Sequence, residues 1–343
     1  RTKAKAKALS KAKTYTVGID LGGTKVAAAL VDDQGRIVSE SRKPTVPPSM
    51  VESDIRTVAM PSAQEIKLHI AYVLEAMADA AIECIEIGTR KLKTKPKIVG
   101  IGLASAGPMN IEKGLLVEPS NFKGWGKVPL VAGLEKALGK RGYKTKIHFQ
   151  NDAIAAALGE GWVGAAKSKS TYVVITVGTG IGTGVIFNGK PAQSMGMGSE
   201  WGHMICSSEG FGKSDSKPGD HEVEGIASGT GLVRRAMKQG LKFNSAAELA
   251  TAARAGDKKA LALFTDASEA LASLLYSLSL GFNPEVFAVS GGMLAIKDCF
   301  LPETIALYES AIKRHPSFKT KIQVSKLGTK AGLIGAAKLP RLI

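Results

Sequence analysis

Cysteine, aromatic residues and long apolar runs are all scarce in this sequence. Its 343 residues include three scattered cysteines, Cys84, Cys206 and Cys299, and aromatic residues make up 6%. Scattered cysteines without a CxxC pair argue against a disulfide framework and predict a cytoplasmic location. No apolar run reaches the ~18 residues of a membrane span, and the Lys/Ala-rich start lacks the apolar segment of a signal peptide. We therefore expect no membrane partner.

Acidic residues are outnumbered, so the chain carries a net charge of +16. Six of the positive charges fall in residues 1–13, which contain no acidic residue. We interpret residues 1–14 as a basic N-terminal tail. A basic body can bind nucleic acid, anionic lipid or a polyanionic substrate. The other positive charges are dispersed and not interleaved with aromatic residues, so we expect a solvated surface and no specific nucleic acid.

Strand and helix patterns alternate along the whole chain, and 44% of the residues are apolar. That length suits about two domains of ~150 residues. The first half predicts three strands within 15–43, a loop at 44–62, a helix at 62–87, a strand at 97–105, a helix at 129–139, a strand at 146–150 and a helix from Asp152. The second half predicts two strands within 171–188, a polar loop at 188–224, helices within 226–280, and then strand, helix, strand and a last helix. This mixture predicts an α/β fold.

Two glycine-rich turns, each between two apolar runs, raise the question of nucleotide binding. The first, "GIDLGGTK", spans the length of a Walker A loop but has Thr24 and Lys25 in the wrong order. The second, "GTGIGTG" at 178–184, leads into a strand, whereas a Rossmann fingerprint opens a helix. A third design remains, in which two β-hairpins present backbone N–H groups to a phosphate chain.

The side chains around these turns suit a polyphosphate and its cation. Thr24 and Thr179 can donate hydroxyl groups to phosphate oxygens. Asp20 can hold Mg²⁺ through water, because Mg²⁺ keeps most of its waters. A single such turn is more easily explained as an ordinary hairpin; two of them, one in each half, favour phosphate binding.

Five motifs in order resemble the ROK family of sugar kinases, within the actin-like and hexokinase-like superfamily. They are "GIDLGGTK", "QNDAIAAALGE", "TVGTGIGTGVI", "GSEWGH" and "VSGG", and the resemblance covers residues 15–338. It implies two actin-like (ribonuclease H-like) domains, at 15–153 and 154–343, each a mixed sheet flanked by helices, around a central cleft. The domains are expected to close on the sugar.

Asp152, between a strand and a helix, is the expected catalytic residue. As a general base it would accept the proton of a sugar hydroxyl that attacks the γ-phosphorus of ATP. The structural alternative is a helix N-cap or first-turn acid. By resemblance Asp152 matches the family's catalytic acid.

A set of polar residues is expected to contact the sugar by the same resemblance. These are Asn121, Asn151, Asp152, Glu200, His203 and Glu224. Glu224 also suits a helix N-terminus, where the dipole favours an acid. For Trp125, close to Asn121, we expect a role in the core.

The resemblance assigns a second set of residues to ATP. These are Asp20, Gly22, Gly23, Thr24, Lys25, Gly178, Thr179, Gly180, Gly229, Gly291 and Gly292. ATP and Mg²⁺ are the expected cofactors.

The stretch 206–224 departs from the family, in which many members bind zinc with one His and three Cys. Here only Cys206 remains, and Glu222 stands two residues before Glu224. Tetrahedral zinc needs four such ligands, whereas His203, Cys206 and His221 supply three at irregular spacing, so we expect no zinc site. Relatives without zinc include kinases that use inorganic polyphosphate, which keeps polyphosphate open as a donor.

The favoured function is an ATP-dependent hexose kinase acting on the 6-hydroxyl, with glucose as the first choice. N-acetylhexosamine, mannose and fructose remain alternatives, as does a polyphosphate-dependent glucokinase. A sugar-sensing transcriptional regulator is less favoured, because about fourteen residues precede the first hairpin. An actin-like ATPase that binds proteins would not need the polar sugar-binding set. Homodimers are common in the family, so we expect one here.

Overall fold

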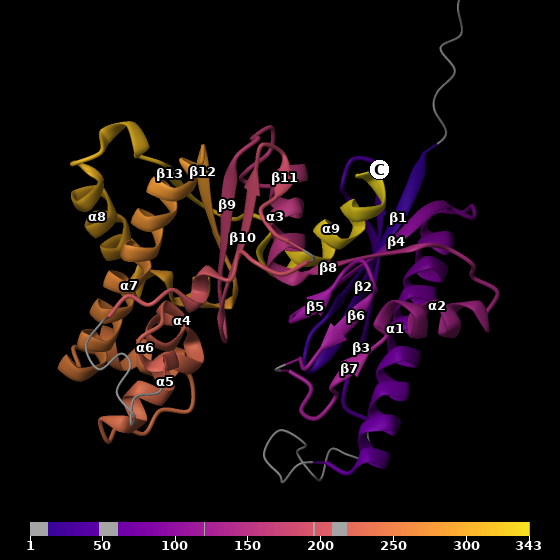
Figure 1. The fold of residues 1–343 in the computed structure, drawn as a ribbon, viewed down its shortest axis with the longest axis horizontal. Coiled ribbons are helices and arrows are strands. Elements are labelled where there is room, and N and C mark those ends of the chain that lie inside the picture. The colour runs from indigo at the N-terminus through magenta and orange to yellow at the C-terminus, as the bar shows by residue number, and fades with distance from the viewer. Residues whose placement is uncertain (1–12, 48–60, 120, 195, 208–217, 343) are drawn as a thin grey trace, which may run out of the picture.

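The computed structural model describes residues 13–47, 61–119, 121–194, 196–207 and 218–342. Two halves lie side by side, and each contains a five-stranded mixed sheet with helices packed on it (Figure 1). The predicted α/β class, with two related mixed sheets, is confirmed. Most of the loop predicted at 44–62 lies outside the described residues.

The first sheet is built around the first glycine hairpin. It contains β1 (Thr14–Leu21), β2 (Lys25–Asp32), β3 (Ile37–Pro44), β4 (Lys97–Ser105) and β8 (Ile147–Asn151), in the order β3-β2-β1-β4-β8. β2 is antiparallel to β1 and β3, whereas β4 is parallel to β1 and to β8. The carboxyl ends of β1, β4 and β8 therefore meet at one edge of the sheet.

The second sheet repeats this topology. It contains β9 (Tyr172–Val177), β10 (Ile181–Phe187), β11 (Lys190–Pro191), β12 (Val286–Ser290) and β13 (Lys321–Val324), in the order β11-β10-β9-β12-β13. Strand directions match those of the first sheet position by position. The internal repeat suggested by the two glycine turns is therefore present in the backbone.

Helices α1 (Ala63–Leu92) and α2 (Leu130–Gly139) form a core with the first sheet. Ser62 and Glu65 make a reciprocal capping box that fixes the start of α1. The helix continues past the predicted end at Ile87 to Leu92, and Lys93 ends it in the left-handed region. A small sheet of β5 (Met109–Asn110), β6 (Leu115–Val117) and β7 (Lys127–Val128) supports the loop that carries Asn121.

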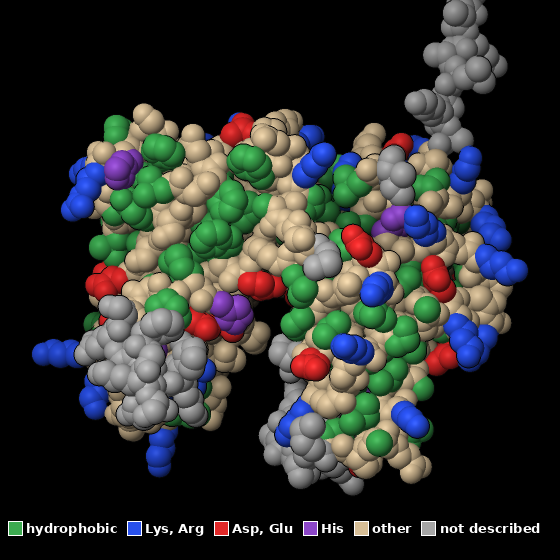
Figure 2. Space-filling model, in the orientation of Figure 1, with side chains coloured by type: hydrophobic (Ala, Val, Ile, Leu, Met, Phe, Trp, Pro, Cys, Tyr) green, Lys and Arg blue, Asp and Glu red, His purple; other side chains and the backbone are tan. Residues whose placement is uncertain are grey.

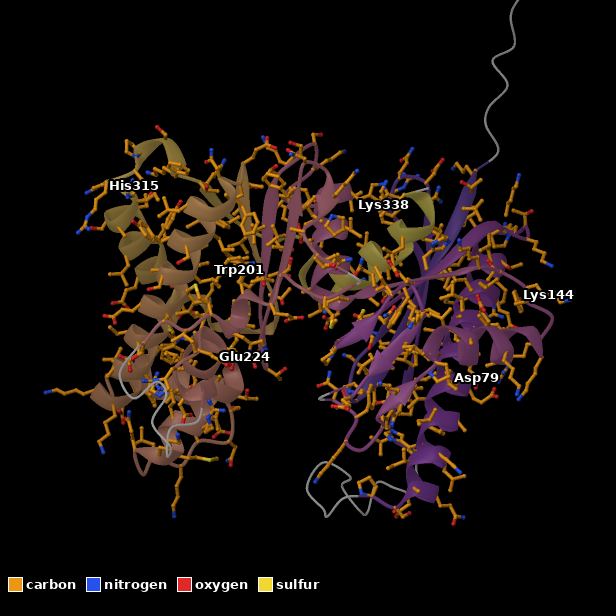
Figure 3. The ribbon with its side chains drawn as sticks, viewed as in Figure 1. Asp79, Lys144, Trp201, Glu224, His315 and Lys338 are labelled. Carbon is orange, nitrogen blue, oxygen red and sulfur yellow. The ribbon has the colours of Figure 1, made fainter. Side chains whose placement is uncertain are left out.

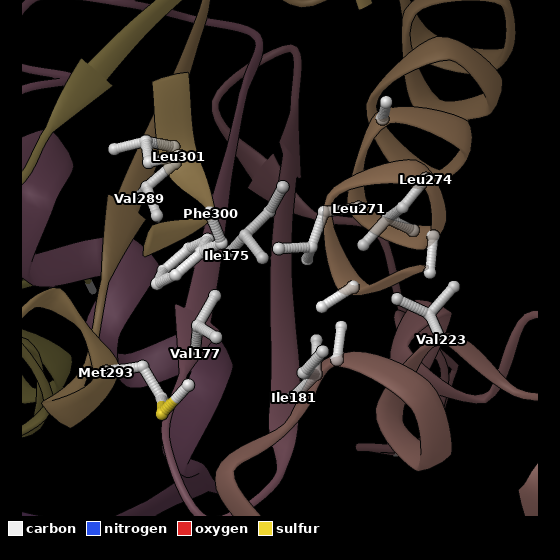
Figure 4. Packing of buried hydrophobic residues seen from close by; sticks show 14 of the residues in the cluster. Ile175, Val177, Ile181, Val223, Leu271, Leu274, Val289, Met293, Phe300 and Leu301 are labelled. Carbon is white, nitrogen blue, oxygen red and sulfur yellow. The ribbon is translucent and has the colours of Figure 1, made fainter. Parts of the chain in front are cut away.

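The second sheet is covered by a helical layer. Its α-helices are α4 (Val223–Ala227), α5 (Gly229–Lys238), α6 (Ala246–Arg254), α7 (Lys258–Phe282) and α8 (Leu301–Ile312). Buried residues of β9, β10 and β12 pack against α4 and α7 in one apolar cluster (Figure 4). The loop predicted at 188–224 also contains short structure, namely β11 and a 3-10 turn at Trp201–His203. No helix in the described part of the chain is long and apolar enough to cross a membrane.

Two helices, α3 (Asp152–Val163) and α9 (Ala331–Lys338), lie between the sheets (Figure 1). Their backbones touch, because a Cβ added at Gly335 would lie 1.6 Å from the carbonyl oxygen of Ala155. α9 also packs on the first sheet, where a Cβ at Gly102 would lie 1.8 Å from the carbonyl oxygen of Ala336. The last helix of the chain therefore returns to the first half and joins it to the second.

Candidate active site

The end of β1 and the start of α3 bring two carboxylates to the same edge of the first sheet. Asp20 pairs with Ala104 of β4, and the next residue of β4, Ser105, pairs with Asn151 of β8. Parallel strands place ligand sites at their carboxyl ends. A cavity of about 160 Å³ is lined by both Asp20 and Asp152.

Asn151, and not Asp152, is the N-cap of α3. The Asn151 side-chain oxygen accepts hydrogen bonds from the backbone N–H groups of Ala153 at 2.9 Å and Ile154 at 3.2 Å. Asp152 is the first residue of the helix, and its Oδ1 accepts a bond from the Ala153 N–H at 2.8 Å. Because capping is done by its neighbour, the Asp152 carboxylate is available to the cavity.

The two carboxylates have raised pKa values. Burial raises the pKa of Asp20 to about 6, the Asp152 charge raises it further, and Lys25 opposes both. Burial also raises the pKa of Asp152, against the hydrogen bond from the Ala153 N–H. Carboxyl groups held in this way suit proton transfer near neutral pH.

Asp20→Asn is expected to stabilise the fold at pH 7.5 by about 1–3 kcal/mol. The folded pKa of Asp20, about 6, lies above the ordinary value of 3.8, so the folded chain binds this proton more tightly than the unfolded chain. Ionisation therefore destabilises the fold, and Asn removes that cost. The gain is full above the folded pKa and disappears as the pH falls to the unfolded pKa. Thermal unfolding between pH 4 and 8 measures it.

The matched control for Asp20→Asn is Asp33→Asn, on an exposed turn of the same half. We expect it to change the free energy of unfolding at pH 7.5 by less than about 0.5 kcal/mol. A destabilising Asp20→Asn at pH 7.5 would contradict the assignment of Asp20 as a buried, unfavourably ionised group.

A larger cavity of about 790 Å³ opens between the two halves. Figure 2 shows the hollow, with acidic and histidine side chains on the wall of the second half, and Figure 3 labels Glu224 there. The predicted sugar-binding set lines this one cavity: Asn121, Asn151, Asp152, Glu200, His203 and Glu224. Gly178, Thr179, Gly180 and Gly291 of the predicted ATP set line it too.

The wall of the second half carries an ordered acid–imidazole pair. His203 Nδ1 lies 2.8 Å from Glu222 Oε2, and this bond raises the pKa of His203. Burial raises the pKa of Glu200, whereas the charge of His203 lowers it. With Nδ1 held by Glu222, the other imidazole nitrogen is available for a hydroxyl group.

Glu224 supports the second glycine hairpin. Its Oε2 accepts a hydrogen bond from the Ile181 N–H at 2.7 Å, and a Cβ at Gly180 would lie 2.5 Å from that oxygen. Only glycine at position 180 allows this approach. Glu224 lies in the first turn of α4, so the helix-terminus role foreseen in the sequence also holds.

The second hairpin also borders a third cavity, of about 780 Å³. Gly178, Thr179 and Thr230 line both this cavity and the larger one. Its other walls come from α5, the start of α6 and the turn after β12: Gly229, Val233, Arg234, Met237, Lys238, Asn244, Ser245, Ala246, Gly292 and Met293. The Thr230 hydroxyl donates to the Thr179 carbonyl at 2.5 Å, which joins α5 to the hairpin.

The first hairpin takes a different position. Gly22, Gly23, Thr24 and Lys25 are not among the residues that line these three cavities. Gly23 lies against the Asn121 loop, since an added Cβ would come 3.2 Å from the Asn121 Cβ. Lys25 acts on the site through its charge, which lowers the pKa of Asp20. Direct phosphate contacts by these four residues remain predictions.

Several lining residues have no counterpart in the sequence predictions. They are Ala106, Gly107 and Pro108 after β4, Gly196 and Met197 before Glu200, and the apolar residues Val233, Met237 and Met293. Gly107 and Pro108, which follow strand 97–105 after a single alanine, were an available signal. The apolar residues gave no such signal, because their spacing in the sequence is the same as that of residues in a hydrophobic core.

The region expected to lack zinc is described only in part. His203 Nδ1 is bonded to Glu222, and Cys206 Sγ lies 3.6 Å from the carbonyl oxygen of His221. Within the described ranges, no three His, Cys, Asp or Glu side chains are placed to share a metal ion. Residues 208–217 fall outside those ranges, so the expectation stays a prediction.

Two sheets of the same topology, with a polar cavity between them and a glycine hairpin at the cavity wall, define an actin-like phosphotransferase fold. The chain belongs to the ROK family, whose model matches residues 16–341. It is 29% identical to a glucokinase of Thermotoga maritima, over 95% of this chain and 97% of the relative. It is also 29% identical to an N-acetylmannosamine kinase of Haemophilus influenzae, over 94% and 93%.

Two solved structures of ROK proteins superpose on this chain. A ROK hexokinase from Thermus thermophilus superposes with a TM-score of 0.73 at 29% identity, over 95% of this chain and 96% of that one. A ROK glucokinase from Streptomyces griseus, solved with glucose and AMPPNP, gives 0.66 at 25% identity, over 95% and 99%. The resemblance inferred from the five motifs is therefore confirmed.

Proposed function

We propose that this protein is a hexose kinase that transfers the γ-phosphate of ATP to the 6-hydroxyl of a hexose, with glucose as the favoured acceptor. One observation carries the proposal. Asp152 lies in a cavity with five further side chains that can bind hydroxyl groups, and the hairpin at its wall also borders a second cavity large enough for a nucleoside. The glucokinase relatives support glucose.

Asp152 is the general base in this proposal. It accepts the proton of the 6-hydroxyl as that oxygen attacks the γ-phosphorus, and the raised pKa of Asp152 makes it a stronger base than an exposed carboxylate. Asn121, Glu200 and His203 orient the other hydroxyl groups. Phosphoryl transfer depends mainly on positioning and charge neutralisation, so these hydroxyl-binding side chains contribute to the rate by positioning the hexose.

The site fits Mg²⁺, which ATP-dependent phosphoryl transfer requires. Asp20 lines the small cavity together with Asp152, and it accepts no hydrogen bond from the described residues. A carboxylate left without donors suits a hard cation that keeps several waters. Asp20 would hold the ion through water, and the ion would neutralise charge on the phosphates.

The nucleoside cavity favours ATP over inorganic polyphosphate as donor. Val233, Met237 and Met293 give it an apolar lining beside Gly229, which is suited to a base and ribose and serves no purpose for a phosphate chain. The positive net charge alone is no argument for polyphosphate, because it attracts any polyanion.

Val233→Trp is expected to raise the KM for ATP about tenfold or more, because the indole fills the nucleoside cavity. The KM for glucose should stay within about twofold of wild type. Leu280→Trp, at an exposed position of α7, is the matched control and should change neither constant. Initial rates against both substrates measure this, and an unchanged KM for ATP would contradict the nucleoside assignment.

The broader expectations follow from the same family. We propose a cytoplasmic enzyme that works as a homodimer. N-acetylmannosamine kinase relatives keep N-acetylhexosamine open as acceptor, beside mannose and fructose. A protein-binding ATPase would not require the polar side chains around Asp152.

A coupled assay across a hexose panel, with ATP and polyphosphate as donors, tests the function. We expect ADP release that requires a hexose and is fastest with glucose. Hexose-independent hydrolysis of ATP would contradict the proposal. Faster turnover with polyphosphate than with ATP would show that the donor is polyphosphate, and the proposed hexose acceptor would stand.

A further inference from the structure

A buried histidine of α1, which the chemistry above does not use, connects two parts of the site. His69 is 7% exposed and lies among Thr45, Phe122 and Trp125, which are 0%, 3% and 4% exposed. Its Nε2 lies 2.9 Å from the carbonyl oxygen of Thr45. Its Nδ1 lies 3.2 Å from Nε1 of Trp125. A buried imidazole with both nitrogens hydrogen-bonded restrains the groups on its two sides.

Each of the two bonds leads to a different binding element. On one side, the Thr45 hydroxyl donates to the Gly23 carbonyl at 2.9 Å, and the Thr45 N–H donates to the Thr24 carbonyl at 3.1 Å. Both acceptors belong to the turn of the first glycine hairpin. His69 is therefore linked to the backbone of that turn through a single residue, Thr45.

On the other side, the bond leads to the loop that carries Asn121. Trp125 stacks on Phe122, with ring centroids 4.2 Å apart and planes inclined by 15°. The edge of the His69 ring meets both, with centroid distances of 5.8 Å to Phe122 and 5.4 Å to Trp125. Phe122 directly follows Asn121, so fixing these rings restrains the backbone that carries Asn121.

The partners determine which nitrogen carries the proton. The carbonyl oxygen of Thr45 only accepts, so Nε2 must be the donor, and the indole N–H of Trp125 only donates, so Nδ1 must be the acceptor. Among neutral side chains, imidazole alone offers a donor and an acceptor at these two positions of one rigid ring. Burial lowers the pKa of His69, which favours the same neutral form.

We infer that His69 is a positioning residue. As the neutral Nε2–H tautomer, it holds the Asn121 loop at a fixed position relative to the turn of the first glycine hairpin. The inference rests on the proposed function, because the contact of Asn121 with hexose is itself proposed. Gly23 approaches Asn121 directly, so the relative position of the turn and the loop sets the shape of the site. A shift of either element would misplace the hexose relative to the phosphates.

Two substitutions separate the two bonds. His69→Gln keeps a donor near the Nε2 position and loses the acceptor for Trp125, and Trp125→Phe removes the same bond from the other side. Each should raise the KM for glucose about five- to thirtyfold, as expected for one buried hydrogen bond, with a smaller effect on kcat. The double variant should be little worse than either single variant, because both remove one interaction.

His69→Asn keeps an acceptor near the Nδ1 position and loses the bond to Thr45. It should raise the KM for glucose less than His69→Gln does and affect ATP kinetics more, because Thr45 holds the hairpin. His315→Gln, at an exposed site of the second half, is the control and should match wild type. Unchanged glucose KM values in His69→Gln and Trp125→Phe, or additive effects in the double variant, would overturn the inference.

Nitrogen NMR of the wild-type protein provides a test that needs neither a variant nor turnover. We expect the His69 ring to show a protonated Nε2 and an unprotonated Nδ1, and the Trp125 indole N–H to be protected from exchange. The opposite tautomer or a doubly protonated ring at pH 7.5 would overturn the inference. If no hexose is phosphorylated, the proposed function fails, while the tautomer still decides whether His69 makes these bonds.

Discussion

Asp152→Asn is expected to lower kcat about 10²- to 10⁴-fold, the contribution of a general base. The amide keeps the size of the side chain but cannot accept the hydroxyl proton. Glucose binding should persist within about threefold, because Asn121, Glu200 and His203 remain in place. Steady-state kinetics and calorimetric titration with glucose measure the two effects.

The Asp152→Asn substitution should not destabilise the fold. Asn151 caps α3, so loss of the Asp152 charge removes no cap. The pKa of Asp152 is raised, so its ionisation disfavours the folded state at neutral pH and the amide should slightly stabilise it. Asn151→Ala is the contrasting variant, expected to lose about 1 kcal/mol of stability through the cap. An Asp152→Asn enzyme with near wild-type kcat would eliminate Asp152 as the base.

Gly335→Ala is expected to destabilise the protein by about 3 kcal/mol or more, because the added methyl group overlaps backbone and no rotamer can relieve it. The Cβ would lie 1.6 Å from the carbonyl oxygen of Ala155 and 2.9 Å from the nitrogen of Gly159, both on α3. Separation of α9 from α3 would also displace Asp152, so kcat should fall with the thermal midpoint.

Gly281→Ala, near the end of α7, is the control for this prediction. Nothing lies within 4 Å of a Cβ added there, so the substitution should be neutral or stabilise by about 0.5–1 kcal/mol. Calorimetric unfolding of both variants gives the comparison. Equal midpoints for Gly335→Ala and wild type would show that α3 and α9 do not cross as closely as described.

Local sequence signals predicted the framework of the fold and singled out Asp152, which lines the cavity. The glycine turn at 178–180 was recognised by its flanking apolar runs, and Asp152 by its place between a strand and a helix. The cap was less predictable, because "QND" offers two adjacent residues of equal capping ability. Only the backbone geometry shows that Asn151 takes the cap and leaves Asp152 to the cavity.

Residues whose role depends on distant partners could not be predicted in this way. Val233 and Met293 have the pattern of core residues, and they line a cavity only because α5 and the turn after β12 leave space between them. His69 has the spacing of a buried helix position, and its partner Trp125 lies 56 residues away. α9 belongs by sequence to the second half yet packs on the first sheet, which no local pattern reveals.

The central claim is that the γ-phosphate of ATP moves to a hexose at Asp152. It is tested most directly by following a labelled γ-phosphate through one turnover, with wild type and Asp152→Asn side by side and glucose present. The account predicts that wild type places the label on the 6-oxygen of glucose, and that the variant leaves it on ATP. Label released as inorganic phosphate without glucose, or transferred equally well by the variant, would contradict the account.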